Sequence, residues 1–294
     1  MAESIKIDRA QLLLYDATVT RLVDIALQED IGIGDLTTEA LVPLEQQAEA
    51  TIVAKASGVI CGLPIAQLVF RQLGELVRWE TFVSDGDRVQ PGQTVAAMQG
   101  SAHLLLMGER TALNFLQRMS GVATLTRQFV EAIRGTSAVI LDTRKTIPGW
   151  RLLDKYATAI GGARNHRLRL DDMILIKENH IAIAGGIAPA VQRACMYAER
   201  YQIPVVVEVQ SLSELQEVLS IGGVDRILLD NFSVEQVQEA VHLTAGRLPL
   251  EVSGGVTLET VRAYAETGVQ FISVGALTHS ASALDLSMEI VPLR

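Results

Sequence analysis

The feature that most constrains the fold is a regular alternation of strand-like and helix-like segments in the second half of the chain. Six short apolar runs are typical of buried strands, and they cover residues 138–142, 173–177, 204–209, 226–230, 249–253 and 270–274. Helical periodicity occupies residues 187–200, 211–220, 233–245 and 257–267, with Ser211, Ser233 and Thr257 at the expected N-caps. Repeated strand–helix units of this spacing predict an α/β fold with a parallel sheet, either closed as a barrel or open.

Polar residues and glycines at the ends of these strands favour the barrel. They stand at or just after the end of each run: Arg144-Lys145, Lys177, Glu208, Asp230-Asn231, Ser253-Gly254-Gly255 and Gly275. The active sites of β/α barrels are built at this face, from the carboxyl ends of several strands. The Ser253-Gly254-Gly255 loop is expected to lead directly into the helix at Thr257, an arrangement that binds phosphate through backbone N–H groups.

The first part of the chain predicts a small α+β sandwich domain without chemistry of its own. A helix is expected at 8–29, with Thr20 as its N-cap, and a shorter one after Pro64. Strands are expected at 50–56, 58–62, 77–83 and 94–100. A long helical region starts near Ser101, with a break predicted at Ser120-Gly121. We place this domain at 1–115 and the barrel at 116–279, and expect residues 280–294 to pack on the first domain.

One stretch, 142–180, is unusually basic for this chain. It contains 8 of the 25 Lys and Arg residues but only five acids, a local balance of +3 in a chain whose formal net charge is -9. Arg144 and Lys145 lie between Thr143 and Thr146, and Asn165-His166-Arg167 forms a second polar run. Arginine offers a planar fork and lysine a point charge, a combination that suits carboxylates or phosphates. The stretch therefore predicts a site for a multiply charged anion.

Composition excludes several other classes of protein. A pI near 5.1 argues against general binding of nucleic acid or anionic membranes, which need a basic face. The two cysteines, Cys61 and Cys195, predict no disulfide framework and fit a reducing compartment, so we expect a cytoplasmic protein. No apolar run approaches the length of a membrane span, and no signal peptide is recognisable.

Several motifs in fixed order resemble those of the quinolinate phosphoribosyltransferase (decarboxylating) family, the type II phosphoribosyltransferases also named nicotinate-nucleotide pyrophosphorylases. They are TRKTIPG (143–149), GGARNHR (161–167), LIKENH (175–180), EV (208–209), LDN (229–231), SGG (253–255) and GALT (275–278). Upstream, EDIGIGDLTT (29–38) and ERTALN (109–114) extend the resemblance over nearly the whole chain. Departures from the family pattern are Ala163, Arg169 and Val206.

The resemblance implies an incomplete, seven-stranded β/α barrel, with the seventh strand within 157–169 or the preceding turn. It implies transfer of phosphoribosyl from phosphoribosyl pyrophosphate to quinolinate with decarboxylation, a step of NAD biosynthesis. Mg²⁺ would be brought by the substrate phosphates; no residue is a certain ligand, and Glu208 and Asp230 are the candidates. Lys145, Lys177, Glu208 and Asp230 would be catalytic. Substrate-binding residues would be these four with Arg110, Thr143, Arg144, His166, Arg167, Asn231, Ser253, Gly254, Gly255, Gly275 and Ala276. Arg110 would reach into the site of a partner subunit, in a homodimer with shared active sites or a hexamer of such dimers.

Three other functions are compatible with the same residues. A related pyrophosphorylase of molybdenum-transport operons shares the TRKT element, but Asn165 and Lys177-Glu178-Asn179 favour the quinolinate enzyme. A barrel lyase could use Lys145 or Lys177 as a Schiff-base nucleophile. A sensor could keep the anion pocket without turnover.

Overall fold

The computed structural model describes residues 16–74 and 77–294, which form two compact units. The first unit comprises residues up to 127 together with 147–162 and 281–294, and the second comprises 128–146 and 163–280. This division differs from the predicted boundary between 115 and 116; that point and the observed boundary after residue 127 both fall inside the continuous helix α5 (Ala102–Ala132). It also assigns helix α6 (Arg151–Gly161) to the first unit, although the sequence placed it in the barrel.

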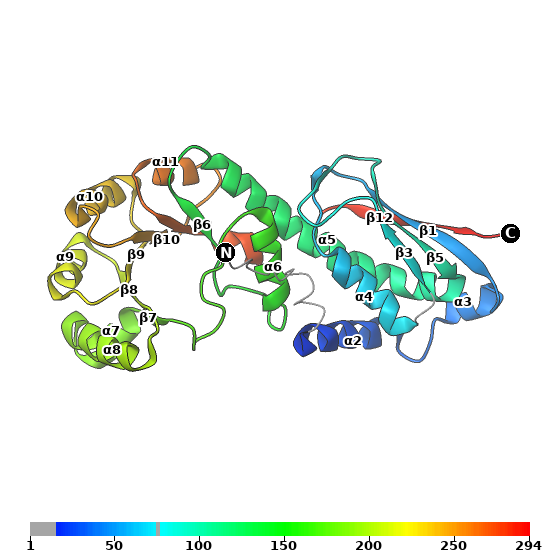
Figure 1. Ribbon diagram of the computed structural model, residues 1–294, viewed down its shortest axis with the longest axis horizontal. Coiled ribbons are helices and arrows are strands. Elements are labelled where there is room, and N and C mark those ends of the chain that lie inside the picture. Colours follow the sequence, from blue (N-terminus) through cyan, green and yellow to red (C-terminus); the bar gives the residue numbers. More distant parts are fainter. Residues whose placement is uncertain (1–15, 75–76) are drawn as a thin grey trace, which may run out of the picture. The chain divides into compact units, whose positions relative to one another are not determined.

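The first unit is built on an antiparallel sheet with strand order β12-β1-β5-β3 (Figure 1). Its strands are β1 (Gln47–Ala54), β3 (Arg78–Thr81), β5 (Thr94–Ser101) and β12 (Leu286–Pro292). Alternate residues of β1, including Ala48, Ala50 and Ile52, are buried, as expected for a strand with one face on the core. The C-terminal strand β12 pairs with β1 over seven residue pairs, so the end of the chain is part of the first unit.

Besides α5 and α6, this unit contains three further helices and a short two-stranded sheet. They are α2 (Ala17–Ile31), α3 (Leu36–Leu41), α4 (Leu63–Leu73), β2 (Gly58–Val59) and β4 (Arg88–Val89). The N-cap of α2 is Asp16, whose carboxylate accepts a hydrogen bond from Thr18 N at 2.8 Å, so the prediction of Thr20 was wrong. The predicted helix segment 8–15 lies outside the described residues. Among those described, no helix is both long enough and apolar enough to cross a membrane.

Helix α5 runs without interruption through Ser120-Gly121, where a break was predicted. Both residues serve packing. Ser120 Oγ accepts a hydrogen bond from Cys61 N at 2.9 Å. A Cβ atom at Gly121 would lie 1.9 Å from the carbonyl oxygen of Ser282, so the glycine admits the backbone of the C-terminal segment against the helix.

The second unit contains a parallel sheet in the order β6-β11-β10-β9-β8-β7, and each strand falls within a predicted run. The strands are β6 (Val139–Leu141), β7 (Ile174–Ile176), β8 (Val205–Val209), β9 (Arg226–Asp230), β10 (Leu250–Ser253) and β11 (Phe271–Ser273). A seventh strand is reduced to one parallel bridge, in which Arg164 pairs with Leu141 of β6. The described sheet therefore has six strands and one bridging residue, which fits the expected incomplete barrel.

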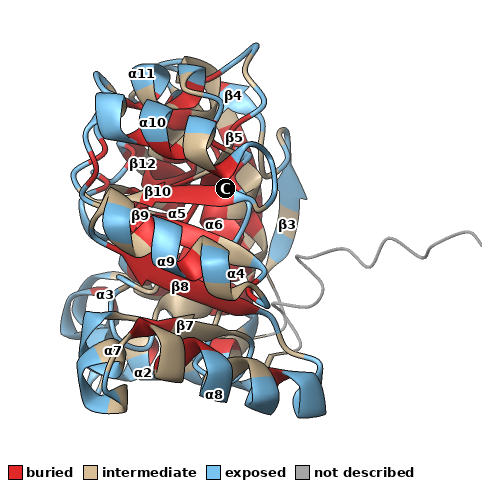
Figure 2. Ribbon diagram, turned by 90° about the vertical axis from the view of Figure 1, so that its left-hand side faces the viewer, coloured by how far each residue is buried: buried red, intermediate tan, exposed pale blue. Residues whose placement is uncertain are grey.

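Helices cover the outer side of this sheet, and its central strands β8, β9 and β10 are buried beneath them (Figures 1 and 2). They are α7 (Glu178–Ala184), α8 (Ile187–Tyr201), α9 (Leu212–Ile221), α10 (Val234–Thr244) and α11 (Val261–Glu266), and a short helix, α12 (Ala276–His279), follows β11. Ser211 and Ser233 are N-caps, as predicted. Thr257 is not, because residues 257–260 form a turn and α11 starts at Val261. The Ser253-Gly254-Gly255 loop thus does not lead directly into a helix.

Gly121→Ala should destabilise the protein even though alanine favours helices. An exposed glycine in a helix interior gains about 1 kcal/mol on replacement by alanine, but here the new methyl group would overlap the backbone at Ser282. We expect the free energy of unfolding to fall by roughly 1–3 kcal/mol, measured by urea denaturation. The control is Gln128→Ala, at an exposed position of the same helix, for which we expect no loss. Equal or greater stability of Gly121→Ala would show that the two backbones do not approach closely.

Candidate active site

A cavity of about 330 Å³ lies at the carboxyl ends of the strands of the second unit, a size typical of small-molecule sites. Nine predicted site residues line it: Thr143, Arg144, Lys145, His166, Arg167, Lys177, Glu208, Asp230 and Ser253. They come from segments up to 110 residues apart in the sequence, between Thr143 and Ser253. Parallel strands bring their carboxyl ends to one edge, which is why residues so distant in sequence meet here.

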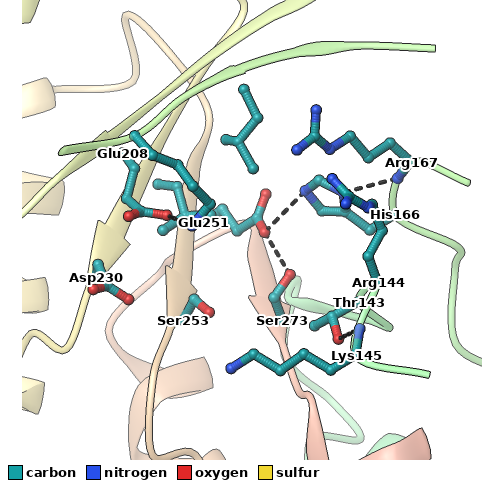
Figure 3. Close-up of a pocket in the computed structure, with 13 residues that line it drawn as sticks. Thr143, Arg144, Lys145, His166, Arg167, Glu208, Asp230, Glu251, Ser253 and Ser273 are labelled. Carbon is teal, nitrogen blue, oxygen red and sulfur yellow. Dashed lines mark hydrogen bonds and ion pairs between the residues drawn. The ribbon is translucent and has the colours of Figure 1, made fainter. Parts of the chain in front are cut away.

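Four lining residues were missed by the sequence analysis: Leu175, Leu228, Glu251 and Ser273. A signal for Glu251 was present, since it is a carboxylate in the middle of an apolar strand, like Glu208. Leu175, Leu228 and Ser273 carry no such signal in the sequence. Cationic side chains of Arg144 and Arg167 lie on one side of the cavity and the carboxylates of Glu208 and Asp230 on the other (Figure 3).

Two arginines face this cavity together. Burial, and then the positive charge of Arg144, lower the pKa of Arg167 from its ordinary value, while Asp172 acts in the opposite direction. Arg167 Nη1 donates to Met173 O at 3.0 Å, which fixes its direction. Arg144 Nε is buried and has no hydrogen-bond partner among the described residues. Like charges in a partly buried place are unfavourable, so this side of the cavity is suited to an anion.

A buried carboxylate anchors the segment that carries Arg167. Asp142, which follows β6, has no exposed surface. Its carboxylate accepts a hydrogen bond from Asn165 Nδ2 and another from His166 N, each at 2.7 Å. Next to it, Thr143 Oγ1 accepts from Lys145 N at 3.0 Å, which shapes the start of the basic loop. The two polar runs that stood out in the sequence are therefore joined through Asp142.

A second buried carboxylate, Glu251 of β10, lies at the floor of the cavity. Its Oε1 accepts from Ser273 Oγ of β11 and lies 3.4 Å from His166 Nε2, and its Oε2 accepts from Arg226 Nη1 at 2.8 Å (Figure 3). Burial alone would raise the pKa of Glu251, but its interactions with His166, Ser273 and Arg226 outweigh burial and lower it from the ordinary value. Glu251 is therefore ionised at neutral pH.

Glu208 and Lys177 form an ion pair on the opposite side. Lys177 Nζ lies 2.5 Å from Glu208 Oε2; the glutamate side chain is almost fully buried, and the lysine is partly exposed. Burial raises the pKa of Glu208, and Lys177 counteracts this, while Glu178 and Asp230 raise it further. Because β8 and β9 pair directly, Glu208 and Asp230 lie on adjacent strands. These two carboxylates can accept hydrogen bonds from hydroxyl groups or from metal-bound water.

Glycine loops surround this carboxylate side. Gly254 has φ +98°, and a Cβ there would lie 2.2 Å from Asn231 Oδ1. Asn231 itself adopts φ 58° and donates its N–H to Ser253 O at 2.8 Å. Gly275 allows Lys145 and His279 to approach, since its Cβ would lie 3.1 Å from Lys145 Cδ. The described residues that line the cavity include Ser253 but not Asn231, Gly254, Gly255, Gly275 or Ala276, which lie in the adjoining loops and at the start of α12.

Arg110 lies elsewhere in the chain. It is an exposed residue of α5 in the first unit, and it is not among the described residues that line the cavity. The structure leaves its expected contact with the substrate of a partner subunit as a prediction.

The cavity of the second unit combines cations for an anionic ligand with carboxylates for hydroxyl groups.

Comparison with known proteins assigns the chain to a family. Residues 35–120 match the N-terminal domain of quinolinate phosphoribosyl transferase and residues 122–289 match its C-terminal domain. Quinolinate phosphoribosyltransferase (decarboxylating) 1b of Nicotiana tabacum is 43% identical over 286 residues, covering 92% of this chain and 81% of the relative. A probable nicotinate-nucleotide pyrophosphorylase (carboxylating) of Bacillus subtilis is 43% identical over 262 residues, covering 89% of this chain and 90% of the relative.

The fold is shared with solved structures. The nicotinate-nucleotide pyrophosphorylase of Francisella tularensis has a TM-score of 0.89 and 41% identity, covering 93% of this chain and 96% of that one. Both domain matches, the identity with the curated relatives and this structural likeness agree. The chain is a member of the quinolinate phosphoribosyltransferase family.

Proposed function

We propose that the protein transfers the phosphoribosyl group of phosphoribosyl pyrophosphate to quinolinate and removes the 2-carboxylate of the ring. The products are nicotinate mononucleotide, pyrophosphate and CO₂. The observation that carries the proposal is the pair of arginines, Arg144 and Arg167, which face one cavity with opposing carboxylates at Glu208 and Asp230. A dianionic aromatic acid and a polyhydroxylated sugar phosphate match these two sides.

Quinolinate binds on the arginine side in this proposal. Its two carboxylates bring negative charge to Arg144 and Arg167, and Arg144 Nε, which has no hydrogen-bond partner among the described residues, gains an acceptor. Charge-assisted hydrogen bonds of guanidinium to carboxylate are short and directional, so they also orient the ring. A ring that is held in one orientation presents its nitrogen to the sugar carbon, and this positioning accelerates the transfer.

Phosphoribosyl pyrophosphate binds on the carboxylate side. Glu208 and Asp230 accept from the ribose hydroxyls and stabilise positive charge that develops on the sugar. Lys145 and Lys177 face the departing pyrophosphate, whose negative charge grows as the bond breaks. Thr143, Asn231, the Ser253-Gly254-Gly255 loop and Gly275-Ala276 supply neutral donors for the phosphate groups.

The same carboxylates fit a magnesium ion that arrives with the substrate. Mg²⁺ keeps several water molecules and is held by one or two carboxylates together with substrate phosphates. Glu208 and Asp230 would hold it, and the ion would neutralise charge on the pyrophosphate. Within residues 16–74 and 77–294, no group of three His, Cys, Asp or Glu side chains is placed to bind a metal by itself. The donor set therefore favours an ion shared with the substrate.

Decarboxylation requires little more from the protein than orientation. Once the ring nitrogen carries the ribosyl group, its positive charge stabilises the carbanion left at C2 when CO₂ departs, and a proton from water then replaces CO₂ at C2. Arg144 and Arg167 keep the ring in place during this step.

We also propose that the enzyme works in a reducing compartment such as the cytoplasm, which suits the free thiols of Cys61 and Cys195.

The direct test is an assay with quinolinate, phosphoribosyl pyrophosphate and Mg²⁺, with nicotinate mononucleotide detected by chromatography. We expect the mononucleotide with quinolinate and none with nicotinate, which lacks the 2-carboxylate. A protein that forms no product from quinolinate, or that forms it equally well from nicotinate, would contradict the proposal.

Arg144→Ala and Arg167→Ala should each weaken quinolinate binding strongly. Loss of a charge-assisted partner for a buried carboxylate costs roughly 2–5 kcal/mol, or an affinity decrease of about 30-fold or more, measurable by isothermal titration calorimetry. Arg200→Ala on α8 is the matched control, since it removes the same charge from an exposed position. Unchanged affinity in both cavity variants would remove these arginines from the binding site.

The pH dependence of turnover should reveal Glu208. Burial raises the pKa of Glu208 above the ordinary value for glutamate, which is about 4.3. The carboxylate therefore becomes protonated at a higher pH than an ordinary glutamate does. We expect kcat to fall as the pH decreases through this raised pKa. In Glu208→Gln the residual activity should lack this acid limb, while Glu217→Gln, an exposed control on α9, should retain it. An acid limb that persists unchanged in Glu208→Gln must belong to another group.

We further propose a homodimer in which Arg110 completes the partner's site. Its exposure on α5 and the resemblance of residues 109–114 to the family pattern support this arrangement. Arg110→Ala and Asp230→Ala should each be nearly inactive alone. In a mixed dimer one site carries both substitutions and the other carries neither, so activity should return when subunits exchange.

Random pairing makes half of the dimers mixed, and recovery should approach about a quarter of the wild-type activity under two-fold symmetry. One chain carries a tag so that exchange can be confirmed, and circular dichroism checks that both parents are folded. Exchanged dimers that stay as inactive as the parents would mean that Arg110 serves its own subunit.

A further inference from the structure

The end of the GALT motif is buried beside the basic loop of the cavity. Thr278, the last residue of this motif, lies on α12 and has no exposed surface. Its hydroxyl oxygen lies 2.7 Å from the carbonyl oxygen of Lys145 and 3.3 Å from that of Gly275. A hydroxyl group has a single proton to donate, and the shorter distance assigns this proton to the Lys145 carbonyl. The loop that follows β6 is therefore bound to the helix that follows β11.

This hydrogen bond differs from the one that helix geometry alone would produce. A threonine in a helix ordinarily donates to the carbonyl three or four residues before it, as Thr126 of α5 does to Val122 O at 2.7 Å. Thr278 instead donates to a residue 133 positions earlier in the chain. The two segments meet because β6 and β11 pair directly, so that the loops at their carboxyl ends are neighbours. The contact thus joins two loops of the cavity's edge.

The start of the same motif directs the side chain of Lys145. A Cβ atom at Gly275 would lie 3.1 Å from Lys145 Cδ, so the aliphatic part of the lysine passes close to the glycine. Beyond this point the side chain extends toward the side of the cavity that carries Ser253 (Figure 3). Lys145 is an exposed residue, and an exposed lysine has many rotamers available to it. The GALT motif restricts this freedom at the backbone of the lysine and along its side chain.

We propose that Thr278 is a positioning residue, whose hydroxyl group holds the backbone of Lys145 so that the lysine ammonium faces the pyrophosphate of the substrate. The inference rests on the proposed function and deepens it. Thr278 is buried and is not among the described residues that line the cavity, so it acts through Lys145. A cation that is already directed at its site loses less freedom when the anion binds, and the anion therefore binds more tightly.

The test is the affinity for pyrophosphate with Mg²⁺, measured by isothermal titration calorimetry, because this binding requires no turnover. In Thr278→Val we expect the affinity to fall about threefold to tenfold, the range for one lost hydrogen bond, while Thr278→Ser, which keeps the hydroxyl group, should stay close to wild type. Thr126→Val removes a buried hydroxyl group from α5 and should leave the affinity unchanged. The affinity for quinolinate should also stay unchanged in Thr278→Val. Equal losses for pyrophosphate and quinolinate would indicate general damage to the cavity and overturn the proposal.

A double-mutant cycle shows whether Thr278 acts through Lys145. In the Lys145→Ala background, Thr278→Val should cause no further loss of pyrophosphate affinity. Gly275→Ala should behave in the same way, because its methyl group would displace the lysine side chain while the backbone, with φ −67°, suits alanine. This variant replaces Thr278→Val in the cycle if circular dichroism shows that Thr278→Val does not fold.

Additive losses in the Lys145→Ala background overturn the proposal, and so does a wild-type protein that does not bind pyrophosphate. A wild-type protein that binds pyrophosphate but forms no mononucleotide contradicts the proposed function alone, since the cycle is measured without turnover.

Discussion

The active site of this protein depends on two carboxylates, Asp142 and Glu251, that have no contact with solvent. An ionised carboxylate is stable in the buried interior only if hydrogen-bond donors or positive charges surround it. Each of the two carboxylates contacts such groups on other segments of the chain. Asp142 binds Asn165 and the backbone of His166, and Glu251 binds Ser273, Arg226 and the ring of His166. The segment that carries Arg167 is therefore attached to the sheet at two points.

This attachment explains how the cavity can keep two like charges together. Arg144 and Arg167 line the same cavity; burial, and then the positive charge of Arg144, lower the pKa of Arg167, and Arg144 Nε has no hydrogen-bond partner among the described residues. Free side chains would relieve this repulsion by moving into solvent, but Arg167 is fixed through its backbone and through Met173 O. The unfavourable arrangement is maintained by the buried carboxylates and is relieved when an anion binds. A site that is arranged before the substrate arrives loses less free energy in ordering itself.

The sequence predicted the parts of this arrangement that are local. It predicted six strands, the Ser211 and Ser233 caps and nine cavity residues. Apolar runs, capping residues and polar strand ends can each be recognised within a short segment of sequence. Parallel topology then places all strand ends on one edge. The N-caps predicted at Thr20 and Thr257 were local errors, and two other errors concern contacts between distant segments. Gly121 was interpreted as a helix break because Ser282, its partner, is more than 160 residues away. Glu251 was missed although a carboxylate in an apolar strand is a local signal; its partners on β9, on β11 and in the loop before β7 could not be inferred.

The most direct test of this account is a crystal structure of the protein with quinolinate bound. We expect the pyridine ring in the cavity of the second unit, with its carboxylates in hydrogen-bonding contact with Arg144 and Arg167. The positions of Asn165, His166 and Glu251 should be the same with and without the ligand. Quinolinate bound outside this cavity, or bound with its carboxylates away from both arginines, would contradict the account.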